Sequence, residues 1–328
     1  MRLITYFIIL ITACLTVAPL IQSGLGQDVL IIIQTDKDTY VYRDTVNISG
    51  RLYFQSNEAG GLVAIQVNEP VSGKILFVRT AIVDNPLPNW GIEILYVKPC
   101  DLAGNPKSEF IKGPSAYAYF ETRVKSNFLS SKPITIVISM FDHDFTPLGV
   151  KIISGTIEPN GIFGGLVAIP IPEWCSLGNS TVYVSALSGL PSEGGYPYCP
   201  DGNASFLIAE SSSHPSTAPS KLQNQSYLLS FTIPPYDTPY SETFPVFASA
   251  YCNGESETTS ISFNVNYIYP EDIDNDHIIS ILDICQVASK YGSTGFDLNW
   301  DPKCDIIPDG KINILDMSKL CGMYNLKY

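Results

Sequence analysis

The chain is poor in charge, in histidine and in recognisable catalytic motifs. Only 16% of its 328 residues are charged, and 32 acidic residues outnumber 19 lysines and arginines, which gives a formal net charge of −13. Because there is no basic face to meet phosphates, nucleic acid is excluded as a partner. The three histidines form no H-E-x-x-H pattern, and G-x-S-x-G, C-x-x-C and phosphate-binding glycine loops are also absent. These absences predict a protein that is not an enzyme.

Long apolar runs are absent beyond the first 21 residues. The single run, from Leu3 to Ile21, follows an arginine and precedes small residues, which predicts a cleaved secretory signal peptide over residues 1–27. An uncleaved anchor is one alternative, because about 19 apolar residues can span a bilayer, and a lipoprotein cleavage site at Cys14 is another. With the signal removed, we expect no membrane span and a secreted or extracellular cell-surface location.

Four N-x-S/T acceptor sequences agree with export. Asn47 has the most weight, because in the segment VNISGRLYF it alternates with apolar residues and is expected on the solvent face of a strand. The candidate glycosylation sites are Asn47, Asn179, Asn203 and Asn224.

Seven cysteines follow the signal segment, and an exported protein can keep them as disulfides. Because seven is odd, at least one of them must be free or pair outside the chain. We favour a disulfide between Cys100 and Cys199 over one between Cys175 and Cys199. In the tail, Cys304 could pair with either of the two other cysteines there.

From residue 28 to about residue 265 the apolar runs are short, rich in Val, Ile, Tyr, Phe and Thr, and bounded by Gly, Pro or Asn. No sustained helical periodicity appears, so we predict a mainly β protein built of sandwiches. One set of expected strands covers residues 29–35, 45–54, 61–68, 74–82, 225–233, 244–252 and 257–266. A second set covers residues 92–99, 117–125, 134–141, 150–157, 165–169, 181–187 and 205–209.

The first four strands open like an immunoglobulin-like or macroglobulin-like repeat, in the segment TDKDTYVYRDTVNISGRLYF. Four strands leave a sandwich half open with bare edges, and three strands of the right kind follow only after residue 222. We therefore predict one sandwich from residues 28–90 and 222–267, a second inserted over 91–209, and a Ser/Pro-rich linker over 210–221. Three complete or partial sandwiches in a row are the alternative.

Helical spacing first appears after residue 267, in a tail that is rich in aspartate. A calcium loop of the EF-hand type supplies oxygens at positions 1, 3, 5, 7, 9 and 12, with position 7 acting through its carbonyl. The segment DIDNDHIISILD, here called loop one, places an oxygen at each of these positions. Its candidate ligands are Asp272, Asp274, Asp276, Ile278, Ser280 and Asp283.

The same pattern returns 33 residues later in DIIPDGKINILD, here called loop two. Its candidate ligands are Asp305, Asp309, Lys311, Asn313 and Asp316. Position 3 is Ile307, which has no side-chain oxygen, so loop two is one ligand short. In loop one His277 occupies position 6, where glycine is usual, at a cost of about 1 kcal/mol. The alternative is that these carboxylates form only a solvated acidic face.

This tail resembles a dockerin, a module with two calcium loops that end in aspartate and each enter one helix. The connector GSTGFDLNWDPKCD is similar to the Asn-Trp-x-Pro link between dockerin repeats. The resemblance covers about one sixth of the chain and implies a small α-helical module over residues 268–328, Ca²⁺ as the ion and a cohesin-like protein as the partner. It also implies partner contacts at Ile281, Leu282, Ile314 and Leu315, which could otherwise pack between the two helices.

The sequence therefore predicts an exported, non-catalytic protein that attaches to a cohesin-type partner through calcium, with its sandwiches as spacer or binding modules. One alternative is a carbohydrate-binding or polysaccharide-degrading component of a surface complex, since exposed tyrosines can stack on sugars; another is a self-assembling surface-layer or filament subunit. The tyrosines considered are Tyr40, Tyr53, Tyr117 and Tyr119, which otherwise fill strand surfaces and cores. His143, between two aspartates, is expected in a polar turn rather than in a metal site.

Overall fold

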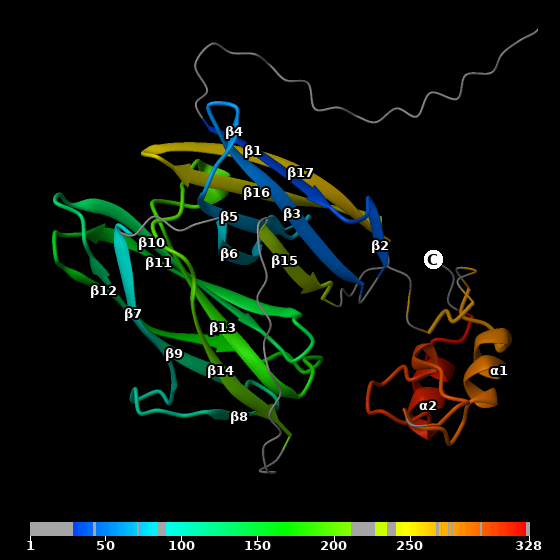
Figure 1. Cartoon of the computed structure of the whole chain (residues 1–328). Helices are drawn as coiled ribbons and strands as arrows, with labels where there is room; N and C mark the ends of the chain where they lie inside the picture. Colours follow the sequence, from blue (N-terminus) through cyan, green and yellow to red (C-terminus); the bar gives the residue numbers. More distant parts are fainter. Residues whose placement is uncertain are drawn as a thin grey trace, which may run out of the picture.

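The structure, a computed structural model, is mainly β, as predicted, and the two α-helices of its described residues lie in the tail (Figure 1). Residues described are 29–41, 44–70, 72–83, 90–210, 227–234, 241–266, 269, 271–274, 276, 278–295 and 297–325. The predicted signal peptide, nearly all of the predicted linker, and Asn224 lie outside these residues. Among the described residues, no helix is both long and apolar enough to cross a membrane.

The first sandwich joins early and late strands of the chain. In one sheet the early strand β3 has β1 on one side and the late strand β15 on the other, and β4 also pairs with β3. The second sheet has the order β2-β17-β16-β5-β6, so the late strands β16 and β17 again meet early ones. The strands are β1 (Val29–Thr35), β2 (Thr39–Val41), β3 (Thr45–Phe54), β4 (Asn57–Glu58), β5 (Gly61–Asn68), β6 (Ile75–Val83), β15 (Tyr227–Thr232), β16 (Ser241–Cys252) and β17 (Glu255–Asn266).

The second sandwich uses only strands that lie between β6 and β15 in the chain. Its sheets have the orders β11-β10-β13-β14-β8 and β12-β9-β7, which is the pairing of a sandwich inserted into another. The strands are β7 (Ile92–Cys100), β8 (Glu109–Ile111), β9 (Tyr117–Ser126), β10 (Lys132–Phe141), β11 (Pro147–Ile157), β12 (Ile162–Pro170), β13 (Gly178–Leu187) and β14 (Gly202–Ala209).

Alternation of apolar and polar residues builds both cores. Every second residue of β1 is buried, starting at Val29, and the same is true of β9, starting at Ala118. Aromatic rings fill the centres of both cores. The ring centroids of Phe77 and Phe231 are 4.9 Å apart in the first core, and those of Phe120 and Phe206 are 5.2 Å apart in the second. The short strands β2, β4 and β8 were not predicted, because two or three residues show no alternation.

The two sandwiches pack on each other over a buried face. All residues from Gly61 to Val67 in β5 and from Ile134 to Phe141 in β10 are buried, so both faces of these strands are covered. Ala64 and Val78 of the first sandwich form one apolar cluster with Val137 and Leu187 of the second. Continuous apolar runs in β5 and β10 are therefore explained by this contact.

A buried ion pair crosses the same contact. Arg79 of β6 donates from Nε to Oδ2 of Asp201 at 2.6 Å, and the other oxygen of Asp201 accepts from the backbone of Thr80 at 2.9 Å. The hydroxyl of Ser185 also donates to Asp201, and the Arg79 guanidinium lies 3.2 Å from the centre of the Tyr183 ring. Burial raises the pKa of Asp201, and the positive charge of Arg79 opposes that shift.

Replacing Asp201 by alanine is expected to destabilise the protein, because it leaves the buried Arg79 charge without a partner. We expect a loss of roughly 3–5 kcal/mol in the free energy of unfolding, measured by urea denaturation at neutral pH. Arg51→Ala is the matched control, since its partner Glu58 and Arg51 itself are 59% and 63% exposed, and it should change the stability far less. Equal small losses in both variants would contradict this account of the junction.

Candidate functional site

Loop one brings three carboxylates together. Asp272, Asp274 and Asp276 each offer one oxygen, and the three oxygens lie within 4.8 Å of one another. Oxygens that share one calcium ion at about 2.5 Å are at most about 5 Å apart, so the spacing fits a single ion of that size. The backbone N–H of Asp276 donates to Oδ1 of Asp272 at 3.1 Å, and that of Ile278 donates to Oδ1 of Asp276 at 2.9 Å. These bonds curl the loop around the carboxylates.

The aspartate at position 12 ties loop one to its helix. Asp283 is fully buried in the first turn of α1 (Ile281–Ser289). Its Oδ1 accepts from the backbone of Ile273 at 2.7 Å, and its Oδ2 accepts from the backbone of Ser280 at 2.7 Å. The Ser280 hydroxyl accepts from Leu282 N at 3.0 Å, which completes a capping box. Asp283 therefore fixes both ends of the loop at the helix N-terminus.

Loop two repeats this arrangement at the start of α2 (Ile314–Gly322). Asp316 is fully buried and accepts from the backbone of Ile307 at 2.9 Å and from that of Asn313 at 2.8 Å. Asp305 accepts from the backbone of Asp309 at 3.3 Å. Ile307 contributes its N–H to this network but no side-chain oxygen, so the loop offers fewer ligands for a hard cation than loop one.

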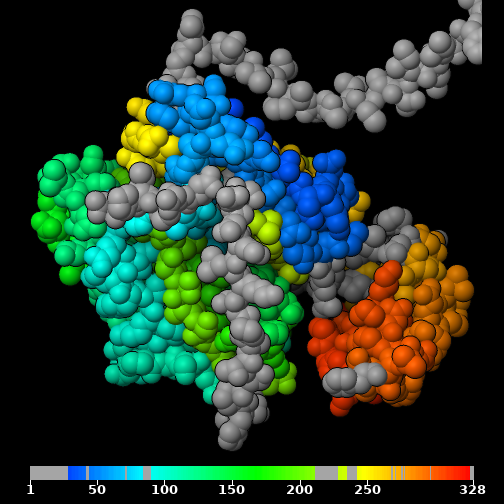
Figure 2. Space-filling model, in the orientation of Figure 1, coloured from blue at the N-terminus to red at the C-terminus, as the bar shows by residue number. Residues whose placement is uncertain are grey.

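The two halves of the module are related residue by residue. Gly292, which follows α1, donates to the carbonyl of Ile312 in loop two at 2.7 Å; Asn325, which follows α2, donates to the carbonyl of Ile279 in loop one at 2.7 Å. Each member of one bond lies 33 residues from its counterpart in the other. Ile279 and Ile312 are both fully buried in the small core of the module. Each loop is thus held by the chain that leaves the opposite helix, and Figure 2 shows the module as a lobe of its own, orange to red.

Both loops concentrate negative charge. The pKa of Asp274 is raised, first by partial loss of water and then by the charges of Asp283 and Asp276. The pKa of Asp305 is raised by desolvation and by the neighbouring charge of Asp316. In both loops the carboxylates lie close enough for their negative charges to repel one another.

The predicted partner residues lie on the surface of the module and not between its helices. Their exposed fractions are 55% for Ile281, 57% for Leu282, 64% for Ile314 and 52% for Leu315. The contact between the helices is made instead by side chains such as Val287 and Leu320, which are fully buried. Four half-exposed apolar side chains at two helix starts form two similar apolar surfaces.

Two functional candidates were missed from the sequence. Tyr291 and Tyr324 follow the two helices at the same 33-residue offset, and they are 56% and 57% exposed. The internal repeat could have identified them, because both halves carry the tyrosine at the same place. They add one exposed aromatic residue after each helix.

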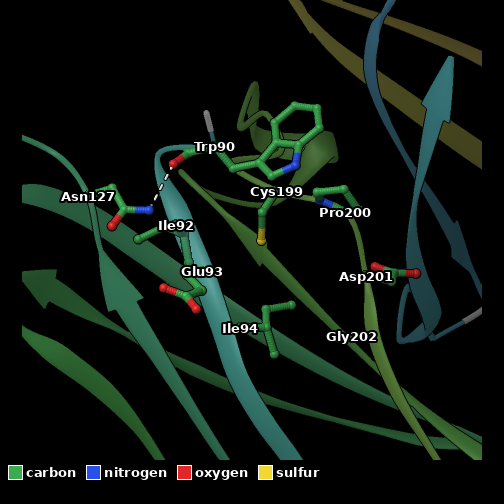
Figure 3. A pocket seen from close by; sticks show the side chains of 9 residues that line it. All are labelled: Trp90, Ile92, Glu93, Ile94, Asn127, Cys199, Pro200, Asp201 and Gly202. Atoms are coloured by element: carbon green, nitrogen blue, oxygen red, sulfur yellow. Dashed lines mark hydrogen bonds between the residues drawn. The ribbon is translucent and has the colours of Figure 1, made fainter. Parts of the chain in front are cut away.

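The predicted disulfide between Cys100 and Cys199 is wrong. All seven cysteines of the described chain are free thiols. Cys199 lies in a cavity of about 400 Å³ beside Trp90 and Ile92, at the start of β7 (Figure 3), whereas Cys100 is the last residue of β7. Eight residues of strand separate Ile92 from Cys100 by about 26 Å, and a disulfide needs Cα atoms within about 7 Å. The sequence predicts that both cysteines belong to one sandwich, but it does not show at which end of that sandwich each cysteine lies.

The candidate glycosylation sites differ in access. Asn179 and Asn203, in neighbouring strands β13 and β14, are exposed. Asn47 is only half-exposed, because its amide donates to Asp36 at 3.1 Å and accepts from the Ser230 hydroxyl at 2.7 Å. Asn47 sits in the central strand β3, which explains why its side chain meets partners on both sides.

The tyrosines and the histidine turn are structural in part. Tyr40 is buried against Phe263 in the first core, and Tyr117 is 46% exposed at the start of β9. Tyr53 and Tyr119 are half-buried. The aspartate before His143, Asp142, is buried and accepts from the backbones of Thr146 and Ser176. It closes the turn between β10 and β11, as predicted for a polar turn.

No family model matches the chain, and no curated protein matches it. Similar solved structures include the C-terminal domain of wzt (11% identity, TM-score 0.31, 40% of this chain and 86% of that one) and a β-glucuronidase from glycoside hydrolase family 2 (11%, 0.29, 51% and 24%). E. coli alpha-2-macroglobulin is a third (8%, 0.23, 74% and 24%). The chain also matches an alkylpurine DNA glycosylase from Pseudomonas fluorescens, of which it spans 31%. At these TM-scores none of the likenesses carries an argument about function, so the dockerin resemblance rests on the residues of the tail.

Thiol labelling should separate two classes of cysteine. Burial raises the pKa of Cys199 to about 12 and those of Cys175 and Cys304 to about 11, so at pH 8 these thiols carry almost no reactive thiolate. Cys285 and Cys321 are exposed and should react within minutes with iodoacetamide, as read by peptide mass spectrometry. The buried thiols should react only after denaturation, and their failure to react even then would show that they form disulfides.

Proposed function

We propose that this is an exported, non-catalytic protein that attaches to a cohesin-type partner protein through its C-terminal module, in a calcium-dependent way. The observation that carries the proposal is the repeated arrangement of the tail. Each carboxylate loop is fixed by a buried aspartate to the start of a helix, and each helix presents an exposed Ile-Leu pair at that start. The carboxylate loop and the apolar pair are therefore adjacent in each half of the module.

The chain's own residues explain why attachment would depend on an ion. The module has a small core, with seven buried apolar residues, so core burial contributes little to its stability. Its loops also gather carboxylates that repel one another. A bound calcium ion is coordinated by six to eight oxygens, and its positive charge offsets this repulsion. Asp272, Asp274, Asp276 and Ser280 would hold the ion in loop one, with the carbonyl of Ile278 and the carboxylate of Asp283.

The exposed apolar residues support a protein as the partner. Ile281 and Leu282 at one helix start, and Ile314 and Leu315 at the other, remain more than half exposed although they are large and apolar. Paired apolar surfaces of this kind are typical of sites that another protein covers. Because the two surfaces carry the same residues, either could engage the partner.

Calcium binding should depend on the two position-3 residues in opposite ways. Asp274→Ala removes an exposed ligand from loop one and should weaken its affinity about tenfold or more, while Ile307→Asp adds a ligand to loop two and should strengthen it. Both effects can be measured by calorimetric titration of the whole chain. Asp297→Asn, in the connector, is the control and should leave both affinities unchanged.

The same titration can contradict the ion assignment. If neither Asp274→Ala nor Ile307→Asp changes the heat of calcium binding, the carboxylates are a solvated acidic face and the loops are not ion sites. Unchanged thermal stability of the module in calcium and in chelator would lead to the same conclusion.

Partner attachment should survive loss of one apolar pair and fail on loss of both. Ile281→Ser with Leu282→Ser, or Ile314→Ser with Leu315→Ser, leaves one surface intact and should retain calcium-dependent binding of a purified cohesin domain in surface plasmon resonance. The quadruple variant should lose it. Leu298→Ser, at a fully exposed connector residue, is the control. Binding of the quadruple variant at wild-type strength would refute the docking surface, and binding of the chain to its own immobilised copy would favour self-assembly.

A further inference from the structure

A groove of about 340 Å³ lies at the junction of the two sandwiches. One wall is the turn between β5 and β6 together with the end of β15, from the first sandwich. The other wall is the start of β11 and the segment that follows β12, from the second. The lining residues are Glu69, Lys74, Ile75, Leu76, Pro147, Leu148, Gly149, Pro170, Pro172, Trp174 and Pro234. Its size falls at the lower end of the range of about 300–1,000 Å³ that is typical of ligand sites, which are frequent at domain interfaces.

The walls of this junction groove are fixed in place. Thr232, near the end of β15, donates from its backbone to the carbonyl of Phe145 at 3.1 Å and from its hydroxyl to the carbonyl of Asp144 at 2.6 Å. The turn opposite is closed by the backbone bond from Glu69 to Lys74 at 2.8 Å. Four prolines stiffen the lining further. Because its walls are already ordered, the groove should lose little conformational entropy when it binds a ligand.

The lining combines buried leucines with one open aromatic ring. Leu76 and Leu148 are each 7% exposed, whereas Trp174 is 42% exposed in a turn after β12. An indole ring left this open can stack on the apolar face of a sugar ring. An extended peptide is a poorer occupant, because binding of a peptide strand needs backbone N–H donors and the four prolines of the lining have none.

The accessible charge in the groove is positive. The carboxylate of Glu69 is only 17% exposed, because the Ser72 hydroxyl donates to one oxygen and the ammonium of Lys74 lies 3.7 Å from the other. Lys74 is 67% exposed, so its remaining donors face solvent. In a chain with a formal net charge of −13, the groove is lined by an exposed lysine and an open aromatic ring, and the lysine suits an anionic group on the ligand.

We propose that the junction groove binds a short segment of an acidic glycan, with a sugar ring on Trp174 and a uronate carboxylate beside Lys74. This site goes beyond calcium-dependent attachment and does not depend on it, since no residue of the C-terminal module lines the groove. The two sites would join a glycan and a partner protein on one chain.

The test is calorimetric titration of the whole chain, at one fixed calcium concentration, with a glucuronate-containing oligosaccharide and with its neutral glucose counterpart. The wild type should bind the acidic oligosaccharide more tightly, and rising salt should reduce the difference. Lys74→Ala should weaken binding of the acidic oligosaccharide about tenfold and leave the neutral one unchanged. Trp174→Ala should weaken binding of both about tenfold or more. Lys151→Ala, which changes an exposed lysine that does not line the groove, is the matched control.

Three outcomes would overturn the proposal. The first is that neither oligosaccharide binds while circular dichroism shows that the protein is folded. The second is that the acidic oligosaccharide binds Lys74→Ala and Trp174→Ala as tightly as it binds the wild type. The third is that a hexaglutamate peptide competes as strongly as the acidic oligosaccharide, which would show a response to charge alone. Because none of these measurements uses the cohesin partner, they do not bear on the attachment function.

Discussion

A buried ion pair between Arg79 and Asp201 joins the two sandwiches where they meet. A buried charge is stable only with its partner and its hydrogen bonds, so this pair favours the observed docking of β6 on the segment that enters β14. The apolar cluster around Val78 and Leu187 buries apolar surface, but hydrophobic contacts do not favour one orientation of the sandwiches over another. Together the ion pair and the apolar cluster hold the inserted sandwich against the first one. The junction groove exists only because that docking is fixed.

The C-terminal module follows a different physical logic. Its order comes less from apolar burial than from backbone N–H groups that point at carboxylates. Asp283 and Asp316 each accept from the loop with one carboxylate oxygen and from the residue that caps the helix with the other. Large apolar side chains at the helix starts remain exposed in this arrangement. The conformation of the loops should therefore depend on any group that neutralises their carboxylates.

Much of this fold was predictable because its signals are local. Strands β1 and β3 begin and end where period-2 alternation and turn residues place them, and β5 is an apolar run bounded by turn residues. The loop residues could be named because a calcium loop is a fixed spacing within twelve residues, and its return after 33 residues makes the pattern specific. The missed short strands and the wrong Cys100–Cys199 pair share a cause: each depends on which distant segments lie side by side, and no short window of sequence contains that.

The sequence by itself determined the mainly β class, the order of the strands and the duplicated acidic tail, because these follow from periods and spacings within the chain. Tertiary structure alone decided which strands are buried on both faces and where the cysteines lie. It also decided that Trp174 and Lys74 line one groove. Those properties depend on contacts between residues about a hundred positions apart. Such contacts form only when the side chains of two sandwiches meet, which is a matter of three-dimensional fit rather than of local preference.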